Sequence, residues 1–221
     1  MIARSLIIAA AVLAIAPAWA QDWAASCATG RGQDKVLACN KALQAAPEDL
    51  ALRRHLGRAL LDVGDGMGGA TEFGGIAEEL QSDAGAWFDY AAALATDYRF
   101  TEAATAIARS LALDPQRFEA NKIAVIAFER AGRDGEAYQA NLRLAAMGDR
   151  IAMNDIAEAL VDGRGIAADP PRAVTWFERA AQAGHLGAMD RLARIHRDGL
   201  YGRKPDPVAA EQWARRAQEA D

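Results

Sequence analysis

The sequence predicts an all-α fold, a right-handed solenoid of stacked helical hairpins, from two repeat periods and one residue spacing. The stretch DGRGIAADPPRAVTWF at 162–177 returns as DGLYGRKPDPVAAEQWA at 198–214, and a period of 34 residues precedes them. Within each copy, apolar residues recur at the spacing of one helix face. Because a single hairpin cannot cover its own apolar face, the copies are expected to stack.

The first twenty residues, 1–20, have the pattern of a secretory signal peptide. Arg4 precedes an apolar run over 6–16, and the segment ends on the small-x-small residues AWA. The apolar run is shorter than the roughly 20 residues that a membrane helix needs. We therefore expect a mature chain that begins at Gln21, has no integral membrane segment, and is periplasmic or secreted.

Residues 21–49 are expected to form an N-terminal cap, with one helix in ACNKALQAAPED at 38–49 behind a short segment. The chain has two cysteines, Cys27 and Cys39. In an exported protein, an even and closely spaced pair most simply forms a disulfide. A redox pair or a metal site is the alternative. However, the C-x-x-C spacing of redox pairs is absent, and His55, the nearest histidine, adds too few ligands for zinc.

Residues 50–147 carry the period of 34, in copies that start at Leu50, Ala84 and Phe118. Small residues recur where helices must approach closely, and large residues recur where the space between them must be filled. Equivalent positions include Leu52, Ala86 and Ala120, then Leu56, Tyr90 and Ala124, then Leu60, Leu94 and Phe128. These copies are therefore expected to be three consecutive helical hairpins.

Two features of these copies depart from the pattern. The stretch GMGGATEFGG at 66–75 is interpreted either as a flexible loop that closes on a ligand, as a backbone anion site, or as a helix start frayed by glycine. Asn121 stands where Trp87 stands one copy earlier, which predicts looser packing in the later copy.

Residues 148–221 contain the two copies quoted first. In the earlier one, Gly163 is expected to end a helix in the left-handed conformation. Asp169 can then cap the next helix, with Pro170 at the first helical position. The buried stripe of that helix is expected to consist of Ala173, Trp176, Phe177 and Ala180.

The copies of 34 residues resemble tetratricopeptide repeats, and the two C-terminal copies resemble Sel-one-like repeats. The first resemblance is clearest in WFDYAAALATDYRFTEAATAIARSLALDP, at Trp87, Tyr90, Ala91, Leu94, Ala103, Ile107, Ser110 and Pro115. The second rests on the patterns A-x-x-x-[IL]-A, a glycine turn, D-P and A-x-x-W. Both resemblances imply a helical solenoid that acts as a protein-binding scaffold.

The tetratricopeptide resemblance also implies a concave groove that holds a partner protein or an extended peptide. The residues that it places there, as candidates for partner binding, are Arg54, Arg58, Phe88, Ala92, Lys122, Ile126 and Arg130. These side chains suit an acidic or carboxylate-bearing peptide with an aliphatic anchor. The alternative is that they are ordinary solvated side chains.

Composition and motifs point away from nucleic acid and from catalysis. The chain has a net charge of −5 at pH 7 and no basic cluster, so nucleic acid is not an expected partner. Its histidines, His55, His185 and His196, fall in different copies without metal-ligand spacing. His196 occupies the position of Leu160 and is interpreted as a packing residue. We expect no enzyme, cofactor or metal site.

The predicted function is an exported scaffold of the cell envelope that binds another protein. Two alternatives stay open. One is a peptidoglycan- or β-lactam-acting enzyme related to cysteine-rich Sel-one-like proteins, although those relatives carry a cysteine pair in each repeat and this chain has one pair in total. The other is an extracellular factor that acts on a host cell.

Overall fold

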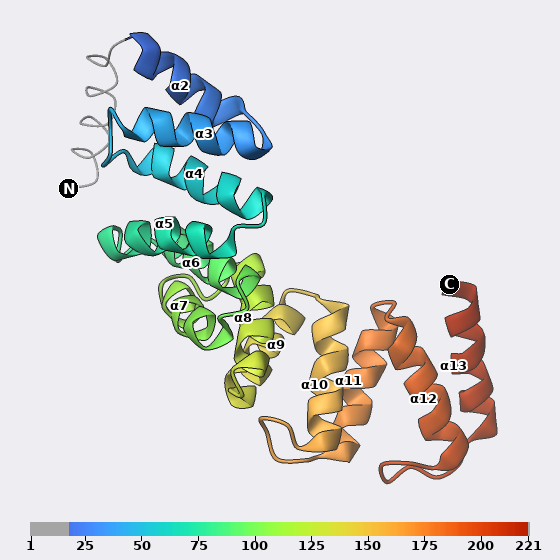
Figure 1. The fold of residues 1–221 in the computed structure, drawn as a ribbon. Coiled ribbons are helices and arrows are strands. Elements are labelled where there is room, and N and C mark those ends of the chain that lie inside the picture. Colours follow the sequence, from blue (N-terminus) through green and yellow to red (C-terminus); the bar gives the residue numbers. More distant parts are fainter. Residues whose placement is uncertain (1–17, 221) are drawn as a thin grey trace. The chain divides into compact units, whose positions relative to one another are not determined.

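The computed structural model describes residues 18–220, and that range consists of twelve α-helices without a strand (Figure 1). The prediction of an all-α helical-hairpin solenoid is therefore confirmed. The chain divides into two compact parts, called here the N-unit, up to Leu113, and the C-unit, from Asp114. Most of the predicted signal peptide lies outside the described residues. Among the helices of 18–220, none is long and apolar enough to cross a membrane.

The N-unit contains three helical hairpins. Each helix packs on the next one along the chain, so the hairpins stack in sequence order. The helices are α2 (Ala18–Thr29), α3 (Gly32–Leu43), α4 (Leu50–Asp62), α5 (Gly66–Glu79), α6 (Ala84–Thr96) and α7 (Phe100–Leu113).

The C-unit repeats this arrangement with three further hairpins. Its helices are α8 (Phe118–Arg130), α9 (Asp134–Ala146), α10 (Arg150–Asp162), α11 (Pro170–Gln182), α12 (Leu186–Asp198) and α13 (Pro207–Ala220). Their core is built around Ile156, Leu160 and Phe177, all fully buried, and buried alanines let the helix backbones approach one another.

Helix ends follow the signals that the sequence carries. Gly163 ends α10 with φ 73°, in the left-handed region, as predicted. Asp169 caps α11 by accepting a hydrogen bond from the Arg172 N–H at 3.1 Å, and Pro170 occupies the first helical position. In the N-unit, Asp49 and Asp83 cap α4 and α6 in the same way. Asp49 and Asp83 thus fix where two first helices begin, and Asp169 fixes where a second helix begins.

The N-terminal segment is a complete hairpin. The disulfide is confirmed, with the Cys27 and Cys39 sulfurs 2.07 Å apart. The sequence analysis expected one helix here, behind a short segment, but Ala18–Thr29 forms a second helix that packs on α3 and also touches α4. The disulfide joins α2 to α3 and lies in a small core with Leu52 and Leu56 of α4.

The glycine-rich stretch 66–75 is neither a loop nor a frayed helix start, because α5 is continuous from Gly66 to Glu79. Its glycines allow a close approach to α4. A Cβ atom at Gly69 would lie 2.7 Å from Cδ2 of Leu61, and one at Gly57 would lie 2.8 Å from Cε2 of Phe73. Tight packing therefore accounts for glycine here and compensates for its poor helix propensity.

Asn121 is held inside its repeat by hydrogen bonds. The side chain is fully buried, and its Nδ2 donates hydrogen bonds to the carbonyl oxygens of Pro115 and Arg117, both at 2.9 Å. Its Oδ1 accepts a third hydrogen bond from Nε of Arg143 at 2.7 Å. Hydrogen bonds thus hold Asn121 at the position that Trp87 fills by packing, and the looser packing of this copy stays a prediction.

Candidate functional site

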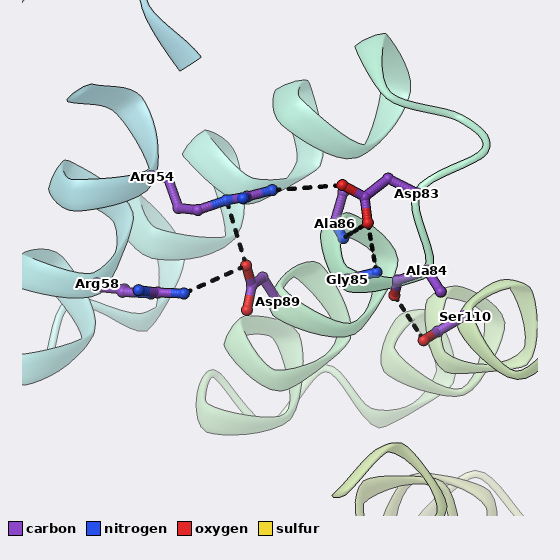
Figure 2. Close-up of polar contacts among 8 residues, drawn as sticks. All are labelled: Arg54, Arg58, Asp83, Ala84, Gly85, Ala86, Asp89 and Ser110. Atoms are coloured by element: carbon purple, nitrogen blue, oxygen red, sulfur yellow. Dashed lines mark hydrogen bonds and ion pairs between the residues drawn. The ribbon is translucent and has the colours of Figure 1, made fainter. Parts of the chain in front are cut away.

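Arg54 and Arg58, the cationic candidates of the N-unit, lie one turn apart on α4 and face α6 (Figure 2). Oδ2 of Asp89 lies 3.6 Å from Nε of Arg54 and 3.9 Å from Nη2 of Arg58. Nη2 of Arg54 is also 3.9 Å from Oδ2 of Asp83. Two carboxylates of α6 and its cap therefore offset the positive charge that the sequence suggested at these positions.

These contacts are ion pairs with unfilled hydrogen-bonding capacity. Nε of Arg54 is buried and has no hydrogen-bond partner, although the guanidinium lies beside Asp83 and Asp89. A buried donor without a partner lowers stability by about 1–3 kcal/mol. The Arg54 side chain is thus held by its ion pairs with Asp83 and Asp89.

The start of α6 is held firmly beneath these arginines. Oδ1 of Asp83 accepts hydrogen bonds from the N–H groups of Gly85 at 2.7 Å and Ala86 at 3.2 Å. The hydroxyl of Ser110, a buried residue of α7, donates to the carbonyl oxygen of Ala84 at 2.8 Å (Figure 2). The aspartates that face the arginines therefore belong to a well-anchored helix.

Phe88 and Ala92, the other two N-unit candidates, lie one turn apart on α6 and are half-buried. Sequence reasoning identified Phe88 but missed its neighbour Asp89, whose side chain is 18 % exposed. In the sequence, Asp89 is noticeable only as a carboxylate next to Phe88, a residue predicted to line the groove. Its role becomes visible only when Asp89 is seen to form ion pairs with Arg54 and Arg58 of α4.

The C-unit candidates form a continuous exposed stripe along α8. Lys122, Ile126 and Arg130 follow one another at intervals of four residues, and Phe118 precedes them at the same interval, so all four share a side of the helix. Ile126 is 53 % exposed and Phe118 is 37 % exposed. Nζ of Lys122 lies 5.8 Å from the centre of the Phe118 ring. We call these four residues the α8 stripe.

The surroundings of the three histidines fit roles in helix capping and packing. Nδ1 of His185 accepts a hydrogen bond from the Ala188 N–H at 3.0 Å and so caps α12. Burial lowers the pKa of both His185 and His55. His196 is half-buried on α12. Among residues 18–220, no group of three or more His, Cys, Asp or Glu side chains is placed to hold a metal ion.

A model of a known repeat family matches the C-terminal third of the chain. The family model of the Sel1 repeat matches residues 150–185 and 187–221. The chain is a repeat protein with two Sel1 repeats. The first Sel1 repeat corresponds to α10 and α11, and the second to α12 and α13. Arg191 of the second repeat forms hydrogen bonds from Nη2 to both carboxylate oxygens of Glu158 in the first, at 2.5 and 2.7 Å.

Solved structures share the fold across most of the chain. A Sel1 repeat protein from Oxalobacter formigenes is 25% identical with a TM-score of 0.51, over 85% of this chain and 81% of that one. MamA protein is 19% identical with a TM-score of 0.65, over 80% and 94%. The antigen c5321 of uropathogenic Escherichia coli, which has an SLR fold, is 20% identical with a TM-score of 0.57, over 84% and 41%.

One curated relative matches part of the chain. Chitin synthase regulatory factor 2 of Schizosaccharomyces pombe is 37% identical over 75 residues, which is 34% of this chain and 15% of that protein. The match therefore spans a small part of the relative. Taken together, the Sel1 repeats and the hairpin solenoid indicate an architecture that commonly serves as a scaffold for protein interactions.

Proposed function

We propose that this protein is an exported scaffold of the cell envelope that binds a partner protein or an extended peptide along the first helices of its repeats. The observation that carries the proposal is the α8 stripe, in which Ile126 is exposed between the cations Lys122 and Arg130, and Phe118 is exposed one turn before Lys122. No residue of the chain is assigned a catalytic role.

The composition of the stripe defines the chemistry of the partner. Burial of an exposed side chain of the size of Ile126 contributes about 1.5–3 kcal/mol when the side chain becomes fully covered. Lys122 and Arg130 would attract carboxylates on either side of that apolar contact, which favours correct orientation more than raw affinity. An acidic segment with an aliphatic anchor therefore suits α8. In the N-unit, Arg54 and Arg58 already contact Asp83 and Asp89.

Two features support export. The pattern of residues 1–20 is that of a signal peptide. The disulfide between Cys27 and Cys39 is of a kind that persists in oxidising compartments and is rare in the cytosol. Together they favour the periplasm or the medium as the place of function.

The enzymatic alternative gains less support. Cysteine-rich Sel-one-like proteins carry a cysteine pair in each repeat, whereas both Sel1 repeats of this chain contain no cysteine. The disulfide instead closes the hairpin of α2 and α3. Assays for peptidoglycan cleavage and β-lactam hydrolysis on the purified protein provide a direct check, and turnover in either would replace the scaffold proposal.

Photo-crosslinking in the native envelope tests the proposal. A photoreactive amino acid at position 126 is expected to yield a discrete adduct with one protein. The same amino acid at position 139 is the matched control, because Gln139 is also exposed but lies on α9, the second helix of the hairpin. The adduct should disappear when Lys122 is changed to Glu in the crosslinking protein. Equal labelling from positions 126 and 139, or none, would contradict a binding role for the stripe.

A further inference from the structure

A small recess lies in the C-unit at the C-terminal end of α8. Its polar lining comes from three helices and the turn that follows α10, and two alanines complete it. The polar residues are Glu129, Asp134, Tyr138, Asn141, Asp155 and Arg164. The cavity measures about 10 Å³, which is close to the room that one water molecule needs. Glu129 is one turn beyond Ile126, so the recess adjoins the α8 stripe.

The floor of the recess consists of polar side chains that lack protein partners. Tyr138 and Asn141 are each 5% exposed. Among residues 18–220, neither the Tyr138 hydroxyl nor the Asn141 amide forms a hydrogen bond, and both residues line the cavity. Buried polar groups are almost always hydrogen-bonded in native proteins. The polar atoms of these two side chains are therefore open to the recess, where water or a polar ligand can contact them.

The walls of the recess carry more negative than positive charge. Three carboxylates, those of Glu129, Asp134 and Asp155, face one guanidinium, that of Arg164. The nearest contact between them joins Nη1 of Arg164 to Oε1 of Glu129 at 3.8 Å, which is too long for a hydrogen bond. Arg164 is 47% exposed at the rim. Its charge compensates the acids only in part.

The surroundings of Glu129 and Asp155 destabilise the charged forms of both carboxylates. Burial raises the pKa of Glu129. The charges of Asp155 and Asp134 raise this pKa further, whereas those of Arg164 and Arg130 lower it. Burial also raises the pKa of Asp155, against a hydrogen bond from Asn154 and the charge of Arg164. An added cation would remove this penalty by pairing with both carboxylates.

We propose that the recess binds the ammonium group of a lysine side chain supplied by the partner. This inference rests on the proposed function, since the lysine would belong to the segment that lies along the α8 stripe. An ammonium group is about the size of a water molecule and donates three hydrogen bonds. The carboxylates, the Asn141 carbonyl and the Tyr138 oxygen can accept them. A guanidinium is larger and presents its donors in a rigid planar fork, which fits a recess of this size less well than an ammonium group.

The proposal makes the partner sequence more specific. Lys122 and Ile126 would contact a carboxylate and an aliphatic side chain, and the recess would take a lysine one turn further along α8. The binding segment would therefore alternate acidic, aliphatic and basic residues. A segment without a lysine at that position would lose the contacts to Asn141 and Asp155.

The test is an NMR titration that follows the side-chain amide signal of Asn141. The probe is blocked lysine, N-acetyl-lysine methylamide, and the matched probes are its Nε-acetylated form and blocked arginine. We expect a saturable shift with lysine and at least about tenfold weaker binding of both controls, a difference of about 1.4 kcal/mol. Equal shifts with all three probes, or none, would show that the recess holds water only.

Variants add an independent measurement. Glu129→Gln and Asp155→Asn are expected to weaken lysine binding at least about tenfold. Glu119→Gln, an equal charge change on the exposed surface of α8, should leave binding unchanged. The variant Asp155→Asn also separates the two proposals. Loss of lysine binding with persistent crosslinking at position 126 would be expected if the recess only adds affinity. Lysine binding by the wild type without any adduct at 126 would overturn the proposed function alone.

Discussion

Asn121 and Trp87 occupy equivalent positions in consecutive repeats and are held in related ways. Nε1 of Trp87 donates to the Gln81 carbonyl oxygen at 3.0 Å, and Nδ2 of Asn121 donates to the carbonyl oxygen of Pro115 at the equivalent position. A second-helix arginine then covers each residue. The guanidinium of Arg109 lies 4.5 Å from the centre of the Trp87 ring, whereas Arg143 donates to Asn121. The two repeats therefore use equivalent contact partners at this position, although one residue is aromatic and the other is an amide.

Replacement of Asn121 by Leu is expected to lower the free energy of unfolding of the C-unit by about 2 kcal/mol, because the partly buried Nε of Arg143 and the Pro115 carbonyl lose their partner. Lys122→Ala, one residue along and exposed, should change stability by less than about 0.5 kcal/mol. Urea denaturation measures both. A loss equal to that of Lys122→Ala would mean that the three hydrogen bonds of Asn121 contribute nothing.

The residues of the candidate site were partly predictable. The resemblance to tetratricopeptide repeats identified Lys122, Ile126 and Arg130, because positions along a helix follow from the 3.6-residue period. It could not identify Asp89 as the partner of Arg54, since that contact depends on how α4 and α6 pack. Asn141 was missed for the same reason, because a polar residue at a helix position gives no sign of what faces it.

At the scale of elements, helix ends were more predictable than helix interiors. Gly163 and Asp169 act where the sequence placed them, because left-handed backbone and capping are local properties. Helix α2 was missed because 18–29 has no equivalent copy and is held by packing on α3 and by the disulfide. Helix α5 was misread because close packing against α4 outweighs the poor propensity of its glycines.

Close packing of α4 on α5 predicts that alanine at Gly57 lowers stability, whereas alanine at Gly135 of α9, which has more space, does not. Gly57→Ala is expected to lower the free energy of unfolding by about 1–3 kcal/mol, since its Cβ would lie 2.8 Å from the ring of Phe73. Gly135→Ala, whose nearest contact would be an ordinary 3.5 Å to the Gly165 carbonyl oxygen, should be neutral or stabilising by up to about 1 kcal/mol. Thermal unfolding measures the stability of both variants. Equal destabilisation by Gly57→Ala and Gly135→Ala would contradict the packing argument.

At the scale of the whole molecule, the chain is two stacks of hairpins with different additions. The N-unit has a disulfide in its first hairpin, whereas the C-unit ends in the two Sel1 repeats. In repeat proteins each hairpin contacts mainly its neighbours, so stabilising features act locally. The disulfide is accordingly expected to stabilise the hairpins nearest to it.

Reduction of the disulfide should therefore affect one end of the molecule. The loop between Cys27 and Cys39 is short, and its closure contributes about 3 kcal/mol in the chain-entropy model. Amide hydrogen exchange with and without reductant should show faster exchange in α2, α3 and α4 and no change in the C-unit. The double variant Cys27→Ala, Cys39→Ala should show the same pattern without reductant. Uniformly faster exchange across both units would contradict local stabilisation.

The affinity of the crosslinked partner for purified protein tests the central claim most directly. The account predicts that Ile126→Asp raises the Kd at least about tenfold, because it removes the apolar contact and adds a charge that repels an acidic partner. Gln139→Asp, which adds the same charge on the exposed side of α9, should leave the Kd within about twofold. An unchanged Kd for Ile126→Asp would contradict the claim that the α8 stripe binds the partner.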